Sequence, residues 1–170
     1  MEIAMLREIM LDGRDTVLRK VSRPLTHITP EDLALLDDMA ETMYHYKGVG
    51  LAAPQTGVLK RLVVADAGQG LIRLINPVIL SAEGRQSGRE SCLSIPGVTA
   101  AVIRPQSILV DTVNEQGRHM PMAFSGIAAS IICHEIDHLD GVLFIDKISK
   151  LKRTLYERKL KKWLKQKKED

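Results

Sequence analysis

The sequence HEIDH, which begins at His134, is an HExxH pattern whose residue types suit metal-assisted hydrolysis. His134 and His138 are four residues apart, so on a helix they share one face about one turn apart and can hold one divalent ion. Glu135 is adjacent to the first histidine and can reach a water on the ion without being a ligand, as a general base does. Asp137, Asp140 or a backbone carbonyl could hold the outer ring nitrogens.

The HExxH pattern is suggestive but not sufficient. Such a run arises by chance in about one in a hundred chains of this length, and its histidines could simply pack or face solvent. Two histidines are also too few, because a catalytic site normally has three protein ligands and one open position for water. A third ligand must therefore come from elsewhere in the chain.

Cys92 is a candidate for the third ligand, although several acidic residues are also possible. It lies in the sequence ESCLSIPG, where Ser, Pro and Gly around a single Cys indicate a shaped loop. The alternative is an ordinary buried thiol. Cys133 is the competing thiol, but it is adjacent to His134 and points roughly 100° away around the helix, which favours core packing over ligation.

A third stretch, GVGLAAPQ, runs from Gly48 to Gln55 and consists mostly of small residues. Gly, Ala and Pro predict a tight loop that lets another chain approach closely. Gln55 ends the loop with an amide, whose NH₂ group could donate to a developing oxyanion. The alternative is that Gln55 only ties the loop down by hydrogen bonds.

These stretches need elements to position them, and the first predicted element is a helix that begins after Thr29. Thr29 can cap this helix, Pro30 suits its first turn, and the acids at positions 31 and 32 favour the positive end of its dipole. Gly48 is predicted to end it. The predicted buried stripe comprises Leu36, Met39, Ala40 and Met43.

The middle of the chain changes to short runs rich in Val, Ile and Leu, which predict strands. Asn114–Gly117 predicts the turn before the last strand, and Ser125 is expected to cap the helix that carries HExxH and ends at Gly141. Another helix is predicted from about Ser149 to Lys167. The predicted strands cover residues 61–66, 71–80, 106–113 and 118–124.

The order of these elements predicts the fold class. Strands in the middle of the chain with helices before and after indicate an α+β fold rather than an alternating α/β fold. We expect short antiparallel strands packed around a central helix that bears HExxH, with N-terminal and C-terminal helices. Residues 1–148 are predicted to form the catalytic domain and residues 149–170 a basic helix of the same domain, because no repeat or linker separates them.

Composition restricts the class of protein further. With 170 residues, of which 45% are hydrophobic and 26% charged, the chain can form one domain with a continuous core. Two cysteines are too few for a disulfide-stabilised secreted scaffold. The N-terminal stretch lacks the apolar core of a signal peptide, and no run reaches roughly 18 apolar residues. A cytoplasmic protein without a membrane span is therefore expected.

Three ordered motifs resemble those of the peptide deformylase family. That family has a GxGLAAPQ loop, an EGCLS loop and an HExDH helix, and the corresponding segments here are Gly48–Gln55, Glu90–Ser94 and His134–His138. Flanking sequences such as INP, SIPGV and HLDGVLFID are similar as well, so the resemblance covers roughly residues 16–150. Three motifs in this order are highly specific.

The resemblance implies a role for each motif residue. Cys92, His134 and His138 would be the metal ligands, with water or hydroxide as the fourth, and Glu135 would be the general acid and base. The metal in this family is usually Fe²⁺, and activity is often kept with Ni²⁺, Co²⁺ or Zn²⁺. A thiolate ligand leaves the ion less electrophilic, which suits an activated formyl group better than a hindered peptide bond.

The resemblance also implies the oxyanion and substrate contacts. Gln55 through its side chain and Leu93 through its backbone N–H would bind the oxyanion, and Gly50 would lend backbone contact to the substrate. Family members remove the formyl group from the N-terminal methionine of newly made proteins, so the implied partners are N-formylmethionyl nascent peptides. Neither DNA nor a membrane is expected as a partner.

Two residues depart from the family pattern, and two other functions remain open. Ser91 replaces the glycine of EGCLS, and Cys133 stands where family members often have Gln. An HExxH metallopeptidase that cuts internal peptide bonds is one alternative, although such proteases usually take a third His or Glu. A non-catalytic, zinc-stabilised module that binds RNA is the other, and it would need four closed ligands.

The basic character of the chain lies at its end. The net charge is +3, but residues 147–170 hold 11 Lys and Arg against 3 Asp and Glu. In the predicted last helix the apolar stripe changes face midway. The first half carries Ile148, Leu151 and Leu155, and the second half carries Tyr156, Leu160, Trp163 and Leu164.

The hypothesis is that the first half of this helix packs on the body and the second half binds ribosomal RNA near the exit tunnel, where a nascent substrate emerges. The alternative is a solvated Lys-rich helix whose Trp163 packs back onto the body. The basic residues expected to surround the second half are Arg158, Lys159, Lys161, Lys162, Lys165, Lys167 and Lys168.

Overall fold

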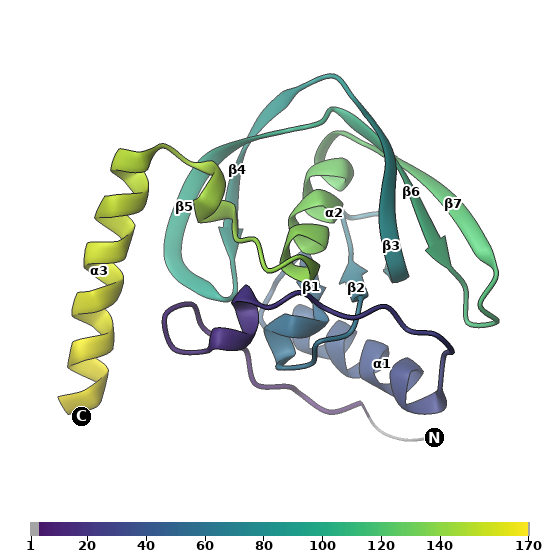
Figure 1. Ribbon diagram of the computed structural model, residues 1–170, viewed down its shortest axis with the longest axis horizontal. Helices are drawn as coiled ribbons and strands as arrows, with labels where there is room; N and C mark the ends of the chain where they lie inside the picture. The colour runs from purple at the N-terminus through teal and green to yellow at the C-terminus, as the bar shows by residue number, and fades with distance from the viewer. Residues whose placement is uncertain (1–3, 170) are drawn as a thin grey trace.

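Helix α2 (Gly126–Leu139) lies at the centre of the computed structural model, between a sheet and a separate hairpin (Figure 1). The structure describes residues 4–169, with side chains as far as Gln166, so the side chains of Lys167 and Lys168 lie outside it. Along α2 the side chains of Ala129, Ile132 and Ile136 pack into a core cluster with the sheet. The α+β arrangement expected from the sequence is confirmed.

The larger sheet has five strands in the order β1-β2-β3-β6-β7, and all its neighbours are antiparallel. Asn114 accepts a backbone hydrogen bond from Gly117, so the predicted turn before β7 is confirmed. The inner face of this sheet covers α2 with apolar side chains, among them Val63, Leu74 and Val110. The strands are β1 (Gly50–Ala52), β2 (Leu62–Ala65), β3 (Ile72–Glu83), β6 (Ser107–Val113) and β7 (His119–Ser125).

A two-stranded hairpin, β4 (Gln86–Cys92) and β5 (Ile95–Arg104), covers the other side of α2. The sequence ESCLSIPG was expected to be a loop, and that prediction is wrong, because only Leu93 and Ser94 form the turn between the strands. A half-buried strand is normally recognised by alternating apolar and polar residues. In β5 this alternation is hidden in the sequence, because the inward positions include the charged Arg104 as well as Ala100 and Val102.

Helix α1 (Pro30–His45) packs under β1 and β2, and its N-terminus is as predicted. Thr29 and Asp32 form a reciprocal capping box, and Pro30 occupies the first turn. The predicted stop at Gly48 is wrong, because the helix ends at His45 and Lys47 takes the left-handed conformation with φ 56°. The predicted stripe of Leu36, Met39, Ala40 and Met43 is buried.

The predicted cap of α2 is also wrong in its chemistry. Ser125 occupies the N-cap position, but its side chain makes no capping hydrogen bond. Strand β7 instead runs directly into the helix, with Ser125 paired to Ser107 and the Gly126 N–H donating to the Gln106 carbonyl at 2.8 Å. Strand pairing therefore fixes the start of α2, and Gly126 makes the turn with φ 59°.

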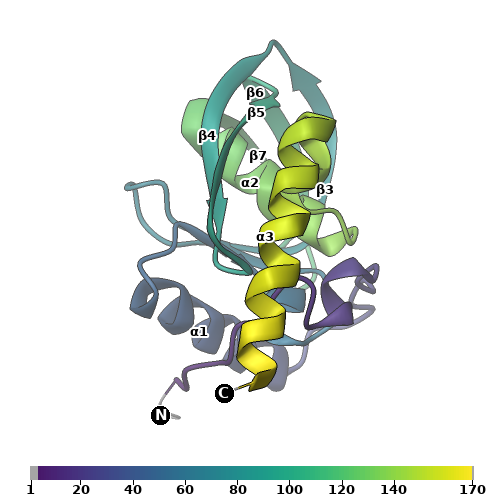
Figure 2. The ribbon, with the colours of Figure 1, turned by 90° about the vertical axis from the view of Figure 1, so that its left-hand side faces the viewer.

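Helix α3 (Lys150–Glu169) stands at the edge of the molecule, beside the hairpin and the N-terminal segment (Figure 2). The face assignment expected from the sequence is wrong, because Leu151 and Leu155 are 71% and 49% exposed, whereas Tyr156 is only 6% exposed. Leu160 packs against the same core cluster as Tyr156. Among the described residues, no helix is long and apolar enough to cross a membrane.

Candidate active site

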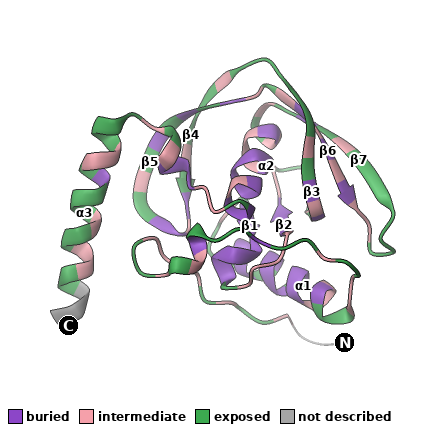
Figure 3. Cartoon of the chain, viewed as in Figure 1, coloured by how far each residue is buried: buried purple, intermediate pink, exposed green. Residues whose placement is uncertain are grey.

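Cys92, His134 and His138 come together at the end of the hairpin and on one face of α2, as the sequence predicted. One ligand atom from each side chain lies within 4.8 Å of the corresponding atoms of the other two, and all three residues are buried. Cys92 Sγ lies 3.2 Å from His138 Nε2. Figure 3 shows buried residues along much of α2, and in such an interior site a thiolate and two imidazoles suit a divalent transition metal.

Cys92 is the last residue of β4, and the strand is irregular immediately before it. The pairing of β4 with β5 shifts register here, because Glu90 pairs with Ala100 and Cys92 with Ile95, so that residues 96–99 of β5 lie opposite Ser91 alone. Ser91 is exposed and lines the cleft. It is not among the described non-glycine residues with positive φ, so this turn does not require the conformational freedom of the family's glycine.

The outer nitrogen of His134 is held by Glu90. His134 Nδ1 lies 2.9 Å from Glu90 Oε2, and this contact fixes the ring so that Nε2 faces the cluster. The sequence expectation that Asp137, Asp140 or a backbone carbonyl would serve is wrong for His134. Asp137 instead accepts from Arg104 at 2.5 Å.

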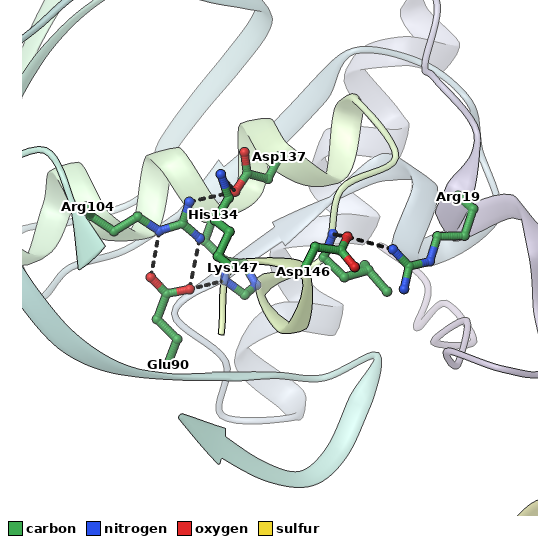
Figure 4. A network of polar contacts seen from close by, with 8 residues as sticks. Arg19, Glu90, Arg104, His134, Asp137, Asp146 and Lys147 are labelled. Carbon is green, nitrogen blue, oxygen red and sulfur yellow. Dashed lines mark hydrogen bonds and ion pairs between the residues drawn. The ribbon is translucent and has the colours of Figure 1, made fainter. Parts of the chain in front are cut away.

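Arg104 organises this polar network, and the sequence analysis missed it (Figure 4). Its guanidinium donates to both oxygens of Glu90, at 2.7 and 2.9 Å, and to Asp137, although Arg104 is only 4% exposed. Burial opposes ionisation of Glu90, but the hydrogen bonds from Arg104 and His134 lower the pKa of Glu90 to about 2. Glu90 therefore stays charged while it orients a ligand ring.

His138 has a different environment from that of His134. Its Nδ1 is buried and has no hydrogen-bond partner among the described residues, whereas Asp140 pairs with Arg61 at 2.8 Å. Burial and the neighbouring His134 lower the pKa of His138 well below its ordinary value. The ring is thus kept neutral, which is the form that binds a metal.

Glu135 lies beside the ligand cluster in a very confined space. Its side chain is buried, and Oε2 has no hydrogen-bond partner among the described residues. Burial raises the pKa of Glu135 to about 7, and the nearby carboxylate of Glu90 adds to the increase, whereas His134 opposes it. A carboxyl group that titrates near neutral pH can both accept and return a proton.

Gly50, at the start of β1, makes room for this carboxylate. A Cβ atom built on Gly50 would lie 2.3 Å from Glu135 Oε1, which is far inside van der Waals contact. The absence of a side chain at Gly50 is therefore required by Glu135. The family resemblance implies a substrate contact for Gly50, which stays a prediction, and the structure shows this packing role.

Gln55 lies in the short 3₁₀ segment η2 (Ala53–Thr56), directly across from the hairpin turn. Its Oε1 accepts from the Ala52 N–H at 2.9 Å, which fixes the amide orientation. Its Nε2 then faces the cluster, 3.5 Å from Cys92 Sγ and 3.2 Å from Ser94 Oγ. This geometry is compatible with both roles considered for Gln55, because its oxygen ties the loop down while its NH₂ group points toward the site.

A cleft of about 1020 Å³ opens onto these groups. Leu93, in the hairpin turn, forms part of its wall, together with Gly50, Gln55, Cys92, His134 and Glu135. Apolar side chains from α2, Ile127 and Ile131, line another part of it. Cys133 is not in the cleft but is buried in the core, as predicted, and burial raises its pKa to about 11.

The fold and this site together define a metal-dependent hydrolase whose ligand set combines a Cys at the end of strand β4 with two His residues of an HExxH helix. The sequence profile of the polypeptide deformylase family matches residues 6–154. The chain therefore belongs to the peptide deformylase family, as the motifs indicated.

Individual relatives agree with this assignment. A peptide deformylase from Acetivibrio thermocellus is 53% identical over 143 residues, which is 84% of each chain. The structure is similar to that of a peptide deformylase from Legionella pneumophila, with a TM-score of 0.87 and 37% identity over 97% of this chain and 99% of that one. It is also similar to an Ehrlichia chaffeensis peptide deformylase in complex with actinonin, with a TM-score of 0.88 and 33% identity over 93% and 97% of the two chains.

Proposed function

We propose that the chain removes the formyl group from N-formylmethionyl nascent peptides in the cytoplasm, with one Fe²⁺ held by Cys92, His134 and His138. The observation that carries this proposal is the convergence of three buried donor atoms within 4.8 Å of one another, beside a carboxylate oxygen of Glu135 that has no hydrogen-bond partner among the described residues. A closed structural zinc site would need a fourth ligand, and the remaining thiol, Cys133, lies in the core instead.

The donor set fits a divalent ion of intermediate softness. A thiolate and imidazoles suit Fe²⁺, Zn²⁺, Ni²⁺ or Co²⁺, whereas Mg²⁺ and Ca²⁺ prefer oxygen ligands. When bound, the ion supplies a Lewis acid that lowers the pKa of water and polarises the formyl carbonyl. The choice of Fe²⁺ rests on the family resemblance.

Glu135 carries the proton in the proposed mechanism. Its carboxylate takes a proton from the attacking water as the water's oxygen bonds to the formyl carbon, and its raised pKa near 7 allows it to hold that proton. Glu135 then returns the proton to the departing amine nitrogen as the C–N bond breaks. The products are formate and a free methionine N-terminus.

Gln55 and Leu93 are proposed to stabilise the charge that develops on the formyl oxygen. The Gln55 Nε2 donor is already fixed by the hydrogen bond from the Ala52 N–H to its Oε1. The Leu93 N–H would be the second donor, from the hairpin turn. In other enzymes, removal of one such donor costs about 3–4 kcal/mol of transition-state stabilisation.

The test is formate release from a formyl-Met peptide by anaerobically prepared, Fe²⁺-loaded protein, beside Glu135→Ala. We expect the wild type to release formate and the variant to be about 10²–10⁴-fold slower, with an unchanged metal content. An internal peptide bond in the same peptide should stay intact, which separates this function from that of a metallopeptidase. Absence of formate release by the wild type would refute the proposal.

We also propose a polyanion-binding surface on the basic helix α3. Arg158, Lys159 and Lys162 are exposed on α3, next to the exposed Leu155, and this surface could bind a polyanion such as ribosomal RNA. Because Tyr156 and Leu160 pack against the body, the binding face is the opposite one from that expected from the sequence.

Ribosome binding measured over a salt series tests this surface. Replacing Arg158, Lys159 and Lys162 by Gln should weaken binding and reduce its salt dependence, because fewer phosphates would be neutralised. Glu substitution of the exposed Gln116, far along the sequence in the β6–β7 turn, serves as a control for a charge change elsewhere. Equal affinity and equal salt slope in the triple variant would rule out the surface.

A further inference from the structure

The N-terminal segment Met10–Asp12 joins two parts of the site that belong to different elements. The Met10 N–H donates to the Gln55 carbonyl at 2.8 Å, and the Asp12 N–H donates to the Ser94 carbonyl at 2.9 Å. Gln55 lies in η2 and Ser94 in the hairpin turn, next to Leu93. Two backbone hydrogen bonds, two residues apart, therefore connect the segments that carry both proposed oxyanion donors.

The reaction rate depends closely on the position of these two donors relative to each other. A preorganised pair of donors stabilises a developing charge without further rearrangement, and displacements of about 0.5 Å weaken such a site. Within the site, the direct polar link between the two segments is the Gln55 contact with Cys92 and Ser94. That contact uses the same Nε2 group that is proposed to donate to the formyl oxygen, so an independent connection is needed to hold the segments during the reaction.

Asp12 is itself anchored by helix α3. The Tyr156 hydroxyl donates to Asp12 Oδ2 at 2.8 Å, and Arg19 lies 3.8 Å from Asp12 Oδ1. Tyr156 is buried, so this hydroxyl bond is protected from water. The N-terminal loop and the C-terminal half of α3 lie side by side in both ribbon views (Figures 1 and 2).

Gly13 shows how closely the two segments pack. A Cβ atom on Gly13 would lie 2.8 Å from Leu160 Cδ2 and 3.0 Å from Leu164 Cδ1, and Gly13 has φ 76°. Only a glycine allows the turn at position 13, directly after Asp12, to lie against α3. The apolar side of α3 is thus occupied by the segment that reaches the active site.

We propose that Met10–Asp12 is a positioning strap for the oxyanion-binding groups and that Tyr156 is the positioning residue that anchors it. This inference rests on the proposed roles of Gln55 and Leu93. It assigns a contribution to the rate of deformylation to α3, a helix whose described side chains do not line the cleft.

The test is Tyr156→Phe, which removes one hydroxyl and keeps the ring in the core. Loss of the Asp12 anchor should lower kcat by about three- to ten-fold with little change in KM, because the donors act mainly on the transition state. Thr154→Val is the matched control, since within the described part of the chain its hydroxyl bonds only to the Lys150 carbonyl of the same helix. That variant should keep the wild-type kcat.

A Gln55→Ala background separates positioning from general stabilisation. Once the Gln55 donor is removed, Tyr156→Phe should have a much smaller effect on kcat, because one of the two groups it positions is gone. An equal fold-loss of kcat in the wild-type and Gln55→Ala backgrounds would overturn the proposal that the strap positions the donors. A Gln55→Ala variant with wild-type kcat would instead refute the proposed role of Gln55, so the two failures are distinguishable.

Gly13→Ala provides a second route to the same result. Its Cβ must push Leu160 and Leu164 away from the loop, so it should loosen the strap without touching Tyr156. The same selective fall in kcat is expected. A normal kcat in both Gly13→Ala and Tyr156→Phe would overturn the proposal.

Discussion

At the scale of single residues, the site depends on one unusually close approach between a glycine and a carboxylate. Glu135 is only 4% exposed, and its Oε1 occupies the space that a side chain at position 50 would take. Burial is also the main reason that the pKa of Glu135 rises to about 7. Position 50 therefore influences where the proton acceptor lies.

Gly50→Ala should consequently reduce activity even though it changes no catalytic group. The new methyl would displace Glu135, since 2.3 Å is too short for any contact. We expect kcat to fall by about 10²-fold, the scale of a misplaced catalytic group, when formate release is measured. In a Glu135→Ala background the same substitution should cost little more, because the displaced carboxylate is absent. A Gly50→Ala enzyme as fast as the wild type would contradict this account.

Cys92, His134 and His138 could be predicted as metal ligands from the sequence, because their residue types and the motifs around them are typical of metal sites. It did not find that Arg104 holds Glu90. The two residues are 14 positions apart in sequence on neighbouring strands, and no periodic pattern connects a buried arginine to a histidine on a distant helix. Glu90 lies within the recognised motif, but only the fold shows that it faces His134.

At the scale of elements, Arg104 fastens the hairpin to helix α2. One guanidinium bonds Glu90 on β4 and Asp137 on α2, and Lys147 lies 3.4 Å from the same Asp137. The three ligands come from these same two elements, so their separation depends on this ionic connection. Charge in this buried network stabilises only while every member is paired.

Arg104→Met should therefore affect stability and metal binding together. Two carboxylates would lose their shared partner, and we expect about 3–5 kcal/mol of destabilisation by urea unfolding. Metal affinity should fall by about 10- to 100-fold, because His134 loses its fixed orientation. Arg73→Met, which breaks the exposed ion pair with Asp37, should cost less than about 1 kcal/mol. Similar effects of the two variants would argue against the network.

The capping box of α1 gives a pH-dependent prediction. Burial alone would raise the pKa of Asp32, but hydrogen bonds from Lys60 and Thr29 outweigh it, so the pKa is lowered below the ordinary 3.8. A carboxyl group whose pKa is lower in the folded state stabilises the fold above its unfolded pKa. This contribution is lost as the pH falls through the folded value.

Asp32→Asn should thus be destabilised by about 1–2 kcal/mol at pH 7, and the difference from the wild type should shrink below about pH 4. Urea unfolding of both proteins at several pH values measures this difference in the free energy of unfolding. Asp37→Asn is the control on the same helix, because Asp37 is exposed and outside the capping box. A difference between Asp32→Asn and the wild type that stayed constant down to pH 2 would show that ionisation is not the cause.

Element prediction succeeded where local signals were strong. The cap and stripe of α1 and the apolar strands β2, β3 and β6 carry their own patterns in sequence. The hairpin β4–β5 does not, because β4 is mostly polar and exposed and its partner buries an arginine. The hairpin also contacts α2 through Arg104 and Glu90, and the local sequence does not show these contacts.

At the scale of the whole molecule, the core formed by the described residues is divided among three apolar clusters. One joins α2 to the sheet, one joins α1 to β1 and β2, and the third joins the hairpin to Leu18, Phe144 and Tyr156. The third cluster includes Cys92 and draws on segments from both ends of the chain. The sequence predicted one domain, but it could not show that α3 packs through Tyr156, because an amphipathic helix with two apolar faces offers no rule for choosing between them.

Metal removal tests how this architecture is stabilised. The sheet, α1 and most of α2 bury their apolar faces without the ligand cluster, so the chain without its ion should keep its fold. A ligand present at 1,000 times its Kd adds about 4 kcal/mol, which corresponds to roughly 8–16 °C in Tm for a chain of this size. Chelation should therefore lower Tm while far-ultraviolet circular dichroism at 25 °C stays unchanged.

Cys92→Ala identifies the site responsible for that shift. The variant should already melt near the Tm of the chelated wild type and should not respond further to chelator, because its ligand set is incomplete. If chelation moved its Tm as far as that of the wild type, the ion would be bound elsewhere. Loss of helical signal in the chelated wild type at 25 °C would instead mean that the ion, rather than the three apolar clusters, holds the hairpin against α2.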